Sequence, residues 1–353
     1  MRAVVAERPG AVELTVDVAG EDRTALAYTA LVGPVREGDR VLLNVTATAL
    51  ELGTGGIDFV VSVAGADAVD VDGPGHIMKL RYSPLQAAVL SVEEEASPHH
   101  ERMRTAESLE GTPVVWAPLH SMVAPAVAGA RAAGAERVAY VMTDGAALGV
   151  PLSRICARLR AAGLLDAVVS SGQAFGGDIE AVNTFSGLLA ARVVAEADVI
   201  VVGDGPGNTG TATRWGATDI ESAMSLVAAR ILGGKPVATL RISFADARAR
   251  HRGVSHHSLT ALGSIVEPGA HVAVPHLADR AQRSAVDDAL RASGVAGRHQ
   301  LVEAEGEPAL DLLAGRGIRI DSMGRSVDDD RAFFLAAGAA GAVAADLAER
   351  GPA

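Results

Sequence analysis

The amino-acid sequence predicts an α/β protein with a doubly wound, mostly parallel sheet preceded by a small amino-terminal β-barrel. The main observation is that short apolar segments alternate with alanine-rich helical segments from residue 113 onward. This alternation is typical of a parallel sheet covered by helices on both faces. A second observation is that strand-like segments in residues 1–72 follow one another with only turns between them. Such spacing favours a small barrel.

These patterns divide the chain into a barrel over residues 1–72, a connecting arm over 73–112 and the doubly wound domain over 113–353. Gly73-Pro74-Gly75-His76 marks the first boundary, because glycine and proline interrupt regular structure. The arm contains a strand-like segment, 80–92, and a solvated helix around 99–107. The barrel strands are expected at 3–6, 12–18, 24–31, 41–45 and 57–63.

Seven strands are expected in the sheet of the doubly wound domain, at 114–117, 138–142, 167–170, 199–202, 237–242, 270–274 and 300–303. A final helix is expected over 328–350, where an acidic first turn suits the dipole at a helix amino terminus. Small residues over 336–345 favour close helix packing and are also compatible with a homodimer.

Composition limits the classes of partner. The chain has 353 residues, 49 % of them hydrophobic, so it can bury a sizeable core. The net charge of −12 argues against a nucleic-acid partner, because such binding needs clustered cations. No signal peptide is visible, and the apolar run 333–345 is shorter than the roughly 20 residues that cross a bilayer. We therefore expect a soluble, cytoplasmic protein with no membrane partner.

The single cysteine, Cys156, excludes intramolecular disulfides and cysteine-cluster metal sites, and it favours a reducing compartment. Leu152, Ile155, Cys156 and Leu159 share one face of a predicted helix. This placement favours a buried structural thiol over a nucleophile.

Polar and small residues follow the predicted strands repeatedly. In open α/β sheets, ligands bind outside the carboxyl ends of the strands, where loops converge at a topological switch point. The pattern therefore predicts one shared pocket, with the ordinary polarity of loops as the alternative explanation. The clusters are Pro118-Leu119-His120-Ser121, Thr143-Asp144-Gly145, Ser170-Ser171-Gly172-Gln173, Gly203-Asp204-Gly205, Ser243-Phe244-Ala245-Asp246 and Pro275-His276.

A glycine-rich loop follows the fourth predicted sheet strand and contains GxGxxG. It does not fit a dinucleotide site, because the next strand ends in Arg241-Ile242-Ser243 rather than in an acidic residue. It is not a Walker loop either, because no Lys-Ser or Lys-Thr pair follows. A turn whose amides hold a phosphate or carboxylate and a turn without a ligand both remain open. The candidate ligand-binding residues are Gly205, Gly207, Asn208, Thr209, Gly210 and Thr211.

Three arginines and three histidines fall within ten residues after the fifth predicted sheet strand. Arginine suits phosphate and carboxylate because its fork matches their geometry. This segment is therefore expected to bind an anion, with a solvated basic loop paired to surface acids as the alternative. Ser255 is also expected near the N-cap of the following helix. The ligand-binding candidates here are Asp246, Arg248, Arg250, His251 and Arg252.

Four residues are candidates for catalysis: His120, Asp144, His256 and His257. Histidine and carboxylate side chains supply acid/base groups, and with His251 and His276 they also supply the ligands of a zinc or manganese site. No spacing matches a metal signature, so a divalent metal remains an open possibility.

Gln173 and Asp178 stand in a third loop that enters a predicted helix. They are candidates for ligand binding, and Asp178 is equally a candidate helix cap.

These motifs resemble an uncharacterised bacterial family, domain of unknown function 3866. The resemblance covers nearly the whole chain and implies no reaction, cofactor or substrate. Two positions depart from the expected family pattern: Gly149, where proline is expected, and Ala212, where glycine is expected. The matching stretches are 118–121, 142–148, 172–183, 203–213, 241–257, 259–262, 323–325 and 333–338.

Two functions follow as hypotheses. The first is a hydrolase or group transferase that acts on a small anionic molecule, held by the glycine loop and the arginines. The second is a non-catalytic sensor or scaffold that binds a metabolite in the sheet domain and docks another protein through the barrel.

Overall fold

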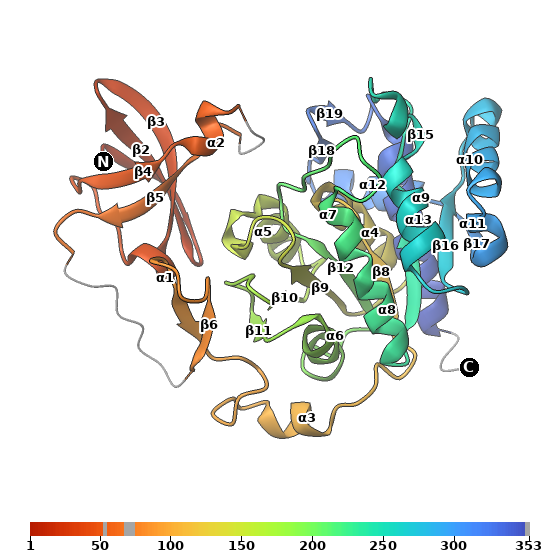
Figure 1. Ribbon diagram of the computed structural model, residues 1–353, viewed down its shortest axis with the longest axis horizontal. Coiled ribbons are helices and arrows are strands. Elements are labelled where there is room, and N and C mark those ends of the chain that lie inside the picture. Colours follow the sequence, from red (N-terminus) through yellow and green to blue (C-terminus); the bar gives the residue numbers. More distant parts are fainter. Residues whose placement is uncertain (52–54, 67–74, 350–353) are drawn as a thin grey trace.

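The computed structural model describes residues 1–51, 55–66 and 75–349, and it shows an amino-terminal sheet, a connecting arm and a larger sheet domain (Figure 1). Gly73 and Pro74, which were expected to mark the first boundary, lie outside the described residues. The mixed α/β class that the sequence predicts is confirmed.

The amino-terminal sheet contains all five predicted strands. In the described residues its order is β1-β2-β3-β5-β4, with β3 parallel to β5 and the other pairs antiparallel. Hydrogen bonds between the two edge strands would close a barrel, and none joins β1 to β4 in the described part of the chain. The closed barrel therefore stays a prediction. The elements are β1 (Ala3–Arg8), β2 (Ala11–Val18), β3 (Glu21–Tyr28), α1 (Thr29–Val32), β4 (Val41–Asn44), α2 (Thr46–Ala49) and β5 (Asp58–Val63).

The connecting arm is fastened to the edge of the larger sheet by a buried lysine. It comprises β6 (Ile77–Lys79), β7 (Ala87–Val89) and α3 (His100–Thr105), so the predicted strand is shorter and the predicted helix is present. Lys79 is fully buried, and its Nζ donates to the carbonyl oxygens of Gly172 (2.8 Å) and Ala181 (3.2 Å). It also pairs with Glu180 at 3.3 Å.

The larger sheet has eight strands in the described residues, all parallel, in the order β11-β10-β9-β12-β8-β13-β16-β17. The seven predicted strands are confirmed, although β13 ends at Thr239 instead of residue 242 because the chain then forms a separate hairpin. The strands are β8 (Pro113–Trp116), β9 (Val138–Thr143), β10 (Ala167–Ser171), β11 (Ile179–Ala181), β12 (Val199–Asp204), β13 (Lys235–Thr239), β16 (His271–Pro275) and β17 (Gln300–Ala304).

The eighth strand corrects one prediction. Asp178 was a candidate cap for a helix, but it stands directly before β11, where its carboxylate accepts the Val168 N–H at 2.8 Å. The helix begins only after Asn183, whose side chain accepts the Ser186 N–H. β11 was missed because its three residues follow a glycine-rich turn and include the charged Glu180.

Helices cover both faces of the larger sheet, as predicted. α4, α12 and α13 pack together on one face, and α6 and α8 pack on the other (Figure 1). The central strands β8, β9, β10 and β12 are mostly apolar and are buried at every position, as a doubly covered parallel sheet requires, whereas the edge strand β17 is largely exposed. The helices are α4 (Val123–Ala132), α5 (Arg154–Ala161), α6 (Thr184–Val193), α7 (Thr218–Ser222), α8 (Met224–Ile231), α9 (His256–Thr260), α10 (Arg280–Ala292), α11 (Val295–Arg298), α12 (Glu307–Gly315) and α13 (Arg331–Glu349). Two short hairpins complete the domain: β14 (Ile242–Ser243) with β15 (Gly253–Val254), and β18 (Asp321–Ser322) with β19 (Arg325–Ser326).

α13 is long and apolar enough to cross a membrane by length and composition alone, but 72 % of its apolar window is buried inside the protein. A Cβ atom on Gly129 of α4 would lie 2.0 Å from the Gly338 carbonyl oxygen, and one on Gly341 would lie 2.0 Å from that of Ala126. The small residues therefore let two helices of one chain touch. They are used inside the core, so they no longer support a homodimer.

The order of the strands creates a switch point beside β8. The chain leaves β8 through α4 on one face, whereas it leaves the neighbouring β12 towards α8 on the other face. The two loops at the carboxyl ends of these strands therefore diverge and leave a crevice between them.

Candidate functional site

A cleft of about 580 Å³ lies at this switch point. The loops after β8, β12 and β13, the start of α5 and the segment leading into the β18–β19 hairpin all contribute to it. Three of the six predicted strand-end loops therefore meet in one cleft, whereas the loops after β9, β10 and β16 do not line it. The lining residues are Leu119, His120, Ser121, Ser153, Arg154, Ile155, Arg158, Pro206, Gly207, Asn208, Thr209, Gly210, Asp219, Arg241, Arg248, His251, His257, Arg319, Ile320, Asp321, Ser322 and Met323.

The cleft is rich in cations although the whole chain carries a net charge of −12. Two of the lining residues are carboxylates, Asp219 and Asp321, and five are arginines: Arg154, Arg158, Arg241, Arg248 and Arg319. Clefts lined by one sign of charge concentrate ligands of the opposite sign. The charge distribution therefore favours an anionic ligand.

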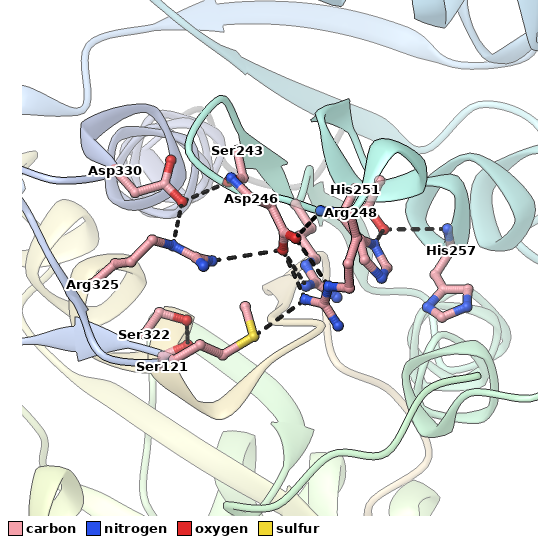
Figure 2. A network of polar contacts seen from close by, with 12 residues as sticks. Ser121, Ser243, Asp246, Arg248, His251, His257, Ser322, Arg325 and Asp330 are labelled. Atoms are coloured by element: carbon pink, nitrogen blue, oxygen red, sulfur yellow. Dashed lines mark hydrogen bonds and ion pairs between the residues drawn. The ribbon is translucent and has the colours of Figure 1, made fainter. Parts of the chain in front are cut away.

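One buried carboxylate, Asp246, contacts arginines that follow β13 and also Arg325 of β19 (Figure 2). Asp246 accepts hydrogen bonds from Arg248 Nε at 2.9 Å and Nη2 at 2.7 Å, and Arg241 and Arg325 lie 3.6 and 3.7 Å away. The hydrogen bonds from Arg248 hold the pKa of Asp246 well below its usual range. Asp246 thus contacts three guanidinium groups, one of which, that of Arg325, also pairs with Asp330.

A second carboxylate, Asp330, fixes the hairpin that forms one wall of the cleft (Figure 2). It accepts Ser243 Oγ–H at 2.6 Å and Arg325 Nε–H at 3.2 Å. On the opposite side, the hydroxyls of Ser121 and Ser322 are 3.0 Å apart. The carboxyl-terminal hairpin is thus tied to the loops after both β8 and β13.

His120 and Ser153 form a hydrogen-bonded pair in the wall of the cleft. The Tyr140 hydroxyl donates its only proton to the main-chain carbonyl oxygen of Asp204, which is 2.8 Å away. His120 Nδ1 lies 3.3 Å from both Tyr140 Oη and this carbonyl oxygen. Since both neighbours accept, Nδ1 carries the ring proton. Nε2 then accepts the Ser153 Oγ–H at 2.7 Å.

Burial keeps the His120 ring neutral. It lowers the pKa of His120 to about 4, although the hydrogen bond to the Asp204 carbonyl acts in the opposite direction. Ser153 Oγ also accepts the N–H of Cys156 at the start of α5, which holds the hydroxyl in place. A hydroxyl beside a neutral, oriented imidazole is the arrangement of an activated nucleophile.

The glycine loop is shaped by buried Asp204. This carboxylate accepts Thr143 Oγ1–H at 2.6 Å, Gly145 N–H at 3.2 Å and Asn208 Nδ2–H at 3.0 Å. Burial raises the pKa of Asp204 to about 6 in spite of these donors. Gly207 has a φ of +91°, which L side chains rarely adopt, so this position favours glycine. Residues 206–210 of this loop line the cleft.

Three histidines gather beside the arginines. His251, His256 and His257 each offer a ring nitrogen, and these nitrogens all lie within 4.8 Å of one another. Ser255 caps α9 as predicted, and its Oγ lies 2.9 Å from His251 Nδ1. Burial is the largest cause that lowers the pKa of each histidine. Neutral imidazoles are the form that binds a metal ion.

Eight of the predicted site residues line the cleft: His120, Gly207, Asn208, Thr209, Gly210, Arg248, His251 and His257. His256 does not line it, but its ring lies 3.9 Å from that of His257, centroid to centroid.

Nine other candidates do not line the cleft: Asp144, Gln173, Asp178, Gly205, Thr211, Asp246, Arg250, Arg252 and His276. Asp144 accepts the Gln173 N–H at 2.8 Å, and Gln173 Oε1 accepts the Arg81 N–H of the arm at 3.1 Å. These groups brace the arm instead of facing the cleft. Gly205 is buried, and a Cβ there would lie 2.3 Å from the Ala147 carbonyl oxygen, so its role is packing.

Several lining residues were missed: Ser153, Arg154, Arg158, Asp219, Arg241 and Arg319. Arg241 offered a signal, because it is a charged residue near the end of the otherwise apolar segment 237–242. Ser153 offered a weaker one, as a serine directly before a helix with one apolar face. Arg319 offered none, because the chain must fold back before its segment reaches the cleft.

The fold and the cleft define an α/β protein with a ligand-sized, cation-rich site at the carboxyl edge of a parallel sheet. The family model described as protein of unknown function (DUF3866) matches residues 24–341. The chain belongs to this family, as its motifs predicted. Searches of curated proteins and of solved structures give no match.

Proposed function

We propose that this protein is a hydrolase or group transferase that acts on a small molecule carrying a phosphate or carboxylate. The observation that carries the proposal is the His120–Ser153 pair, whose Nε2 and Oγ are 2.7 Å apart, in the same cleft as five arginines. The arginines would bind the anionic group of the substrate, and the His120–Ser153 pair would catalyse the reaction.

The arginines would hold the anionic group of the substrate. Arg248 is already oriented by Asp246, so little side-chain entropy is lost when it binds. Arg241 is buried, and its Nε has no hydrogen-bond partner among the described residues. A phosphate or carboxylate oxygen would satisfy this buried donor.

The chemical step would use Ser153 as the nucleophile. Its Oγ forms a bond to the phosphorus or carbonyl carbon of the substrate, and its proton passes to His120 Nε2. The bond to the leaving group breaks, and His120 gives the proton to the departing oxygen. Water then attacks in a hydrolase, or an acceptor hydroxyl in a transferase. His120 takes the proton of that attacking group, and Ser153 Oγ recovers it as it leaves.

The binding half of the proposal is tested by titrating the full-length protein with inorganic phosphate in a calorimeter. Arg248→Ala should weaken phosphate binding about 10- to 100-fold, as expected for loss of a charge-assisted hydrogen bond. Arg252→Ala is the matched control, because Arg252 is exposed on the same loop and does not line the cleft. Equal affinities in both variants would contradict the assigned site.

The catalytic half is tested with a panel of phosphate and carboxylate esters and with a fluorophosphonate probe. We expect turnover and covalent labelling at Ser153, both lost in His120→Asn. Ser121→Ala, which lines the same cleft without a histidine partner, should retain both. No turnover across the panel together with no adduct on Ser153 would show that the pair is structural.

A specific contact favours the second candidate, a metabolite sensor. Arg154 lines the cleft and also pairs with Glu13 of β2 at 2.8 Å. An anion that draws Arg154 towards the cleft would weaken its contact with the amino-terminal sheet. Hydrogen exchange that changes in β2 when phosphate binds, without turnover of any ester, would favour the sensor.

A cytoplasmic location and a closed barrel complete the proposal. The buried apolar α13 is consistent with a soluble protein, which supports the location. Light scattering on the purified protein tests the oligomeric state.

A further inference from the structure

The second chemically organised feature is the cluster of His251, His256 and His257. The Nε2 atoms of His256 and His257 are buried and make no hydrogen bond of normal geometry with the described residues, although the backbone of Thr211 and Thr213 lies close to the His257 ring. A buried polar atom without a partner is costly, so such atoms indicate a missing ligand. Here two such atoms lie in one cluster with a third imidazole. The short segment 251–257 brings the three rings together.

Polar neighbours lie behind two rings of the cluster, those of His251 and His257, which Figure 2 shows beside Arg248. His251 Nδ1 lies 2.9 Å from Ser255 Oγ, so its Nε2 is left for another partner. His257 Nδ1 lies 3.5 Å from Asp219 Oδ1, and the buried Asp219 carboxylate has only the backbone amides of Asp219 and Ile220 close to it among the described donors. A carboxylate or hydroxyl behind each imidazole is the usual arrangement around histidines that bind a metal.

We propose that His251, His256 and His257 form a zinc-type metal centre at the edge of the cleft. Three imidazoles are a ligand set that suits zinc, and three protein ligands leave a fourth position for water or substrate. His251 and His257 line the cleft, so this open position faces the anion.

Small rotations complete the geometry. A zinc ion bound about 2.1 Å from each of three nitrogens in a tetrahedron brings these nitrogens to about 3.4 Å of one another. They now lie within 4.8 Å, so the rings must approach by no more than about 1.4 Å. Gly210 leaves room beside the cluster, because a Cβ there would lie only 3.0 Å from His257 Cε1.

The neighbouring charges couple the metal to the anion. Arg241 and Arg248 are cations close to the cluster and oppose a bare divalent ion. An anion that bridges the arginines and the metal removes this opposition. Metal and anion should therefore strengthen each other's binding by the same factor. This part of the inference rests on the anion-binding cleft proposed above.

Metal binding is tested by calorimetric titration of the chelator-treated full-length protein with Zn²⁺. We expect one equivalent per chain, with affinity lowered more than about 100-fold in His256→Gln and in His257→Gln. His276→Gln is the control, because His276 is exposed and pairs with Glu305 away from the cleft. Unchanged thermal unfolding of the metal-free variants shows that they fold. Absence of zinc binding, or equal binding by all variants, overturns the centre.

Coupling is tested by titrating inorganic phosphate with and without bound Zn²⁺. We expect about a fivefold or larger gain in phosphate affinity with the metal. Equal affinities overturn the coupling. If phosphate binds to the protein but zinc does not, the metal centre is overturned and the anion cleft is supported. Zinc binding with no phosphate binding in either state supports the centre and overturns the cleft.

Discussion

His120 shows how burial changes one residue and the stability of the whole fold. Its pKa falls to about 4 in the folded protein, from an ordinary value of 6.5. The unfolded chain therefore binds a proton at a higher pH than the folded chain. The stability that neutral His120 contributes is complete above pH 6.5 and is lost as the pH falls towards 4.

We predict that lowering the pH from 6.5 to 4 reduces the free energy of unfolding of His120→Gln by less than that of the wild type. Urea unfolding at several pH values in this window measures the difference. The comparison must be between the two proteins, because Asp204 and Asp219 act in the opposite direction. Burial raises the pKa of both carboxyls to about 6, so their contribution is lost as the pH rises through that value. If the free energies of unfolding of the two proteins change with pH in parallel, the folded protein does not lower the pKa of His120.

At the residue scale, the sequence predicted where the site lies in the fold better than it predicted which residues line the site. His120, Arg248 and His257 were found because they follow strands or stand in a dense cationic loop. Asp144 follows a strand in the same way, yet its carboxylate accepts the Gln173 N–H. Position at a strand end does not determine where a side chain points, because the turn after the strand sets its direction.

At the element scale, the arm depends on Lys79. Its ammonium group is fully buried and neutralises Glu180, so replacing it leaves an uncompensated charge. We predict that Lys79→Met lowers the free energy of unfolding by about 3–5 kcal/mol, measured by urea denaturation. Arg104→Met removes an exposed pair with Glu101 and should change it by less than about 0.5 kcal/mol. A small loss in Lys79→Met would mean that the arm is held by its apolar contacts.

The contact between α4 and α13 is equally specific. A Cβ on Gly341 would lie 2.0 Å from the Ala126 carbonyl oxygen, so the helices must separate. Gly341→Ala should cost about 1–3 kcal/mol of stability, with a lower melting temperature. Gly315→Ala is the matched control, because a Cβ there meets no described atom within 4 Å. Equal melting temperatures would contradict the tight packing.

Elements with strong periodicity were predicted from the sequence, and weak ones were not. Buried strands such as β9 and β12 are runs of apolar residues between turns, which indicate a strand without knowledge of their neighbours. β11 has three residues, one of them charged, and is a strand because β10 lies beside it. Its existence depends on tertiary pairing.

At the scale of the whole molecule, Glu13 links the amino-terminal sheet to the cleft. Glu13 is buried and accepts hydrogen bonds from Arg8 at 2.6 Å and from Arg154 at 2.8 Å. Tyr28 of the same sheet packs edge-on against Phe175 of the larger domain, with ring centroids 5.5 Å apart. Removing the charge of Glu13 should therefore affect both parts of the molecule.

We predict that Glu13→Gln lowers the unfolding free energy and strengthens phosphate binding by up to about fivefold, because Arg154 is no longer neutralised. Calorimetry with phosphate and urea unfolding measure the two effects. Glu7→Gln makes the same charge change at an exposed position of β1 and should alter neither. Weaker phosphate binding in Glu13→Gln would show that Glu13 positions Arg154 for the ligand.

The sequence by itself determined the α/β class, nearly all the strands, the cap at Ser255 and the family. These features depend on periodicity, turn residues and motif order, which are local. Only the tertiary structure decided the strand order that puts β8 between β12 and β13, and hence the cleft. It also decided that Ser153 meets His120 and that Arg319 reaches the same cavity. Contacts between distant segments depend on how the sheet pairs and which way each loop turns, and no local pattern contains that information.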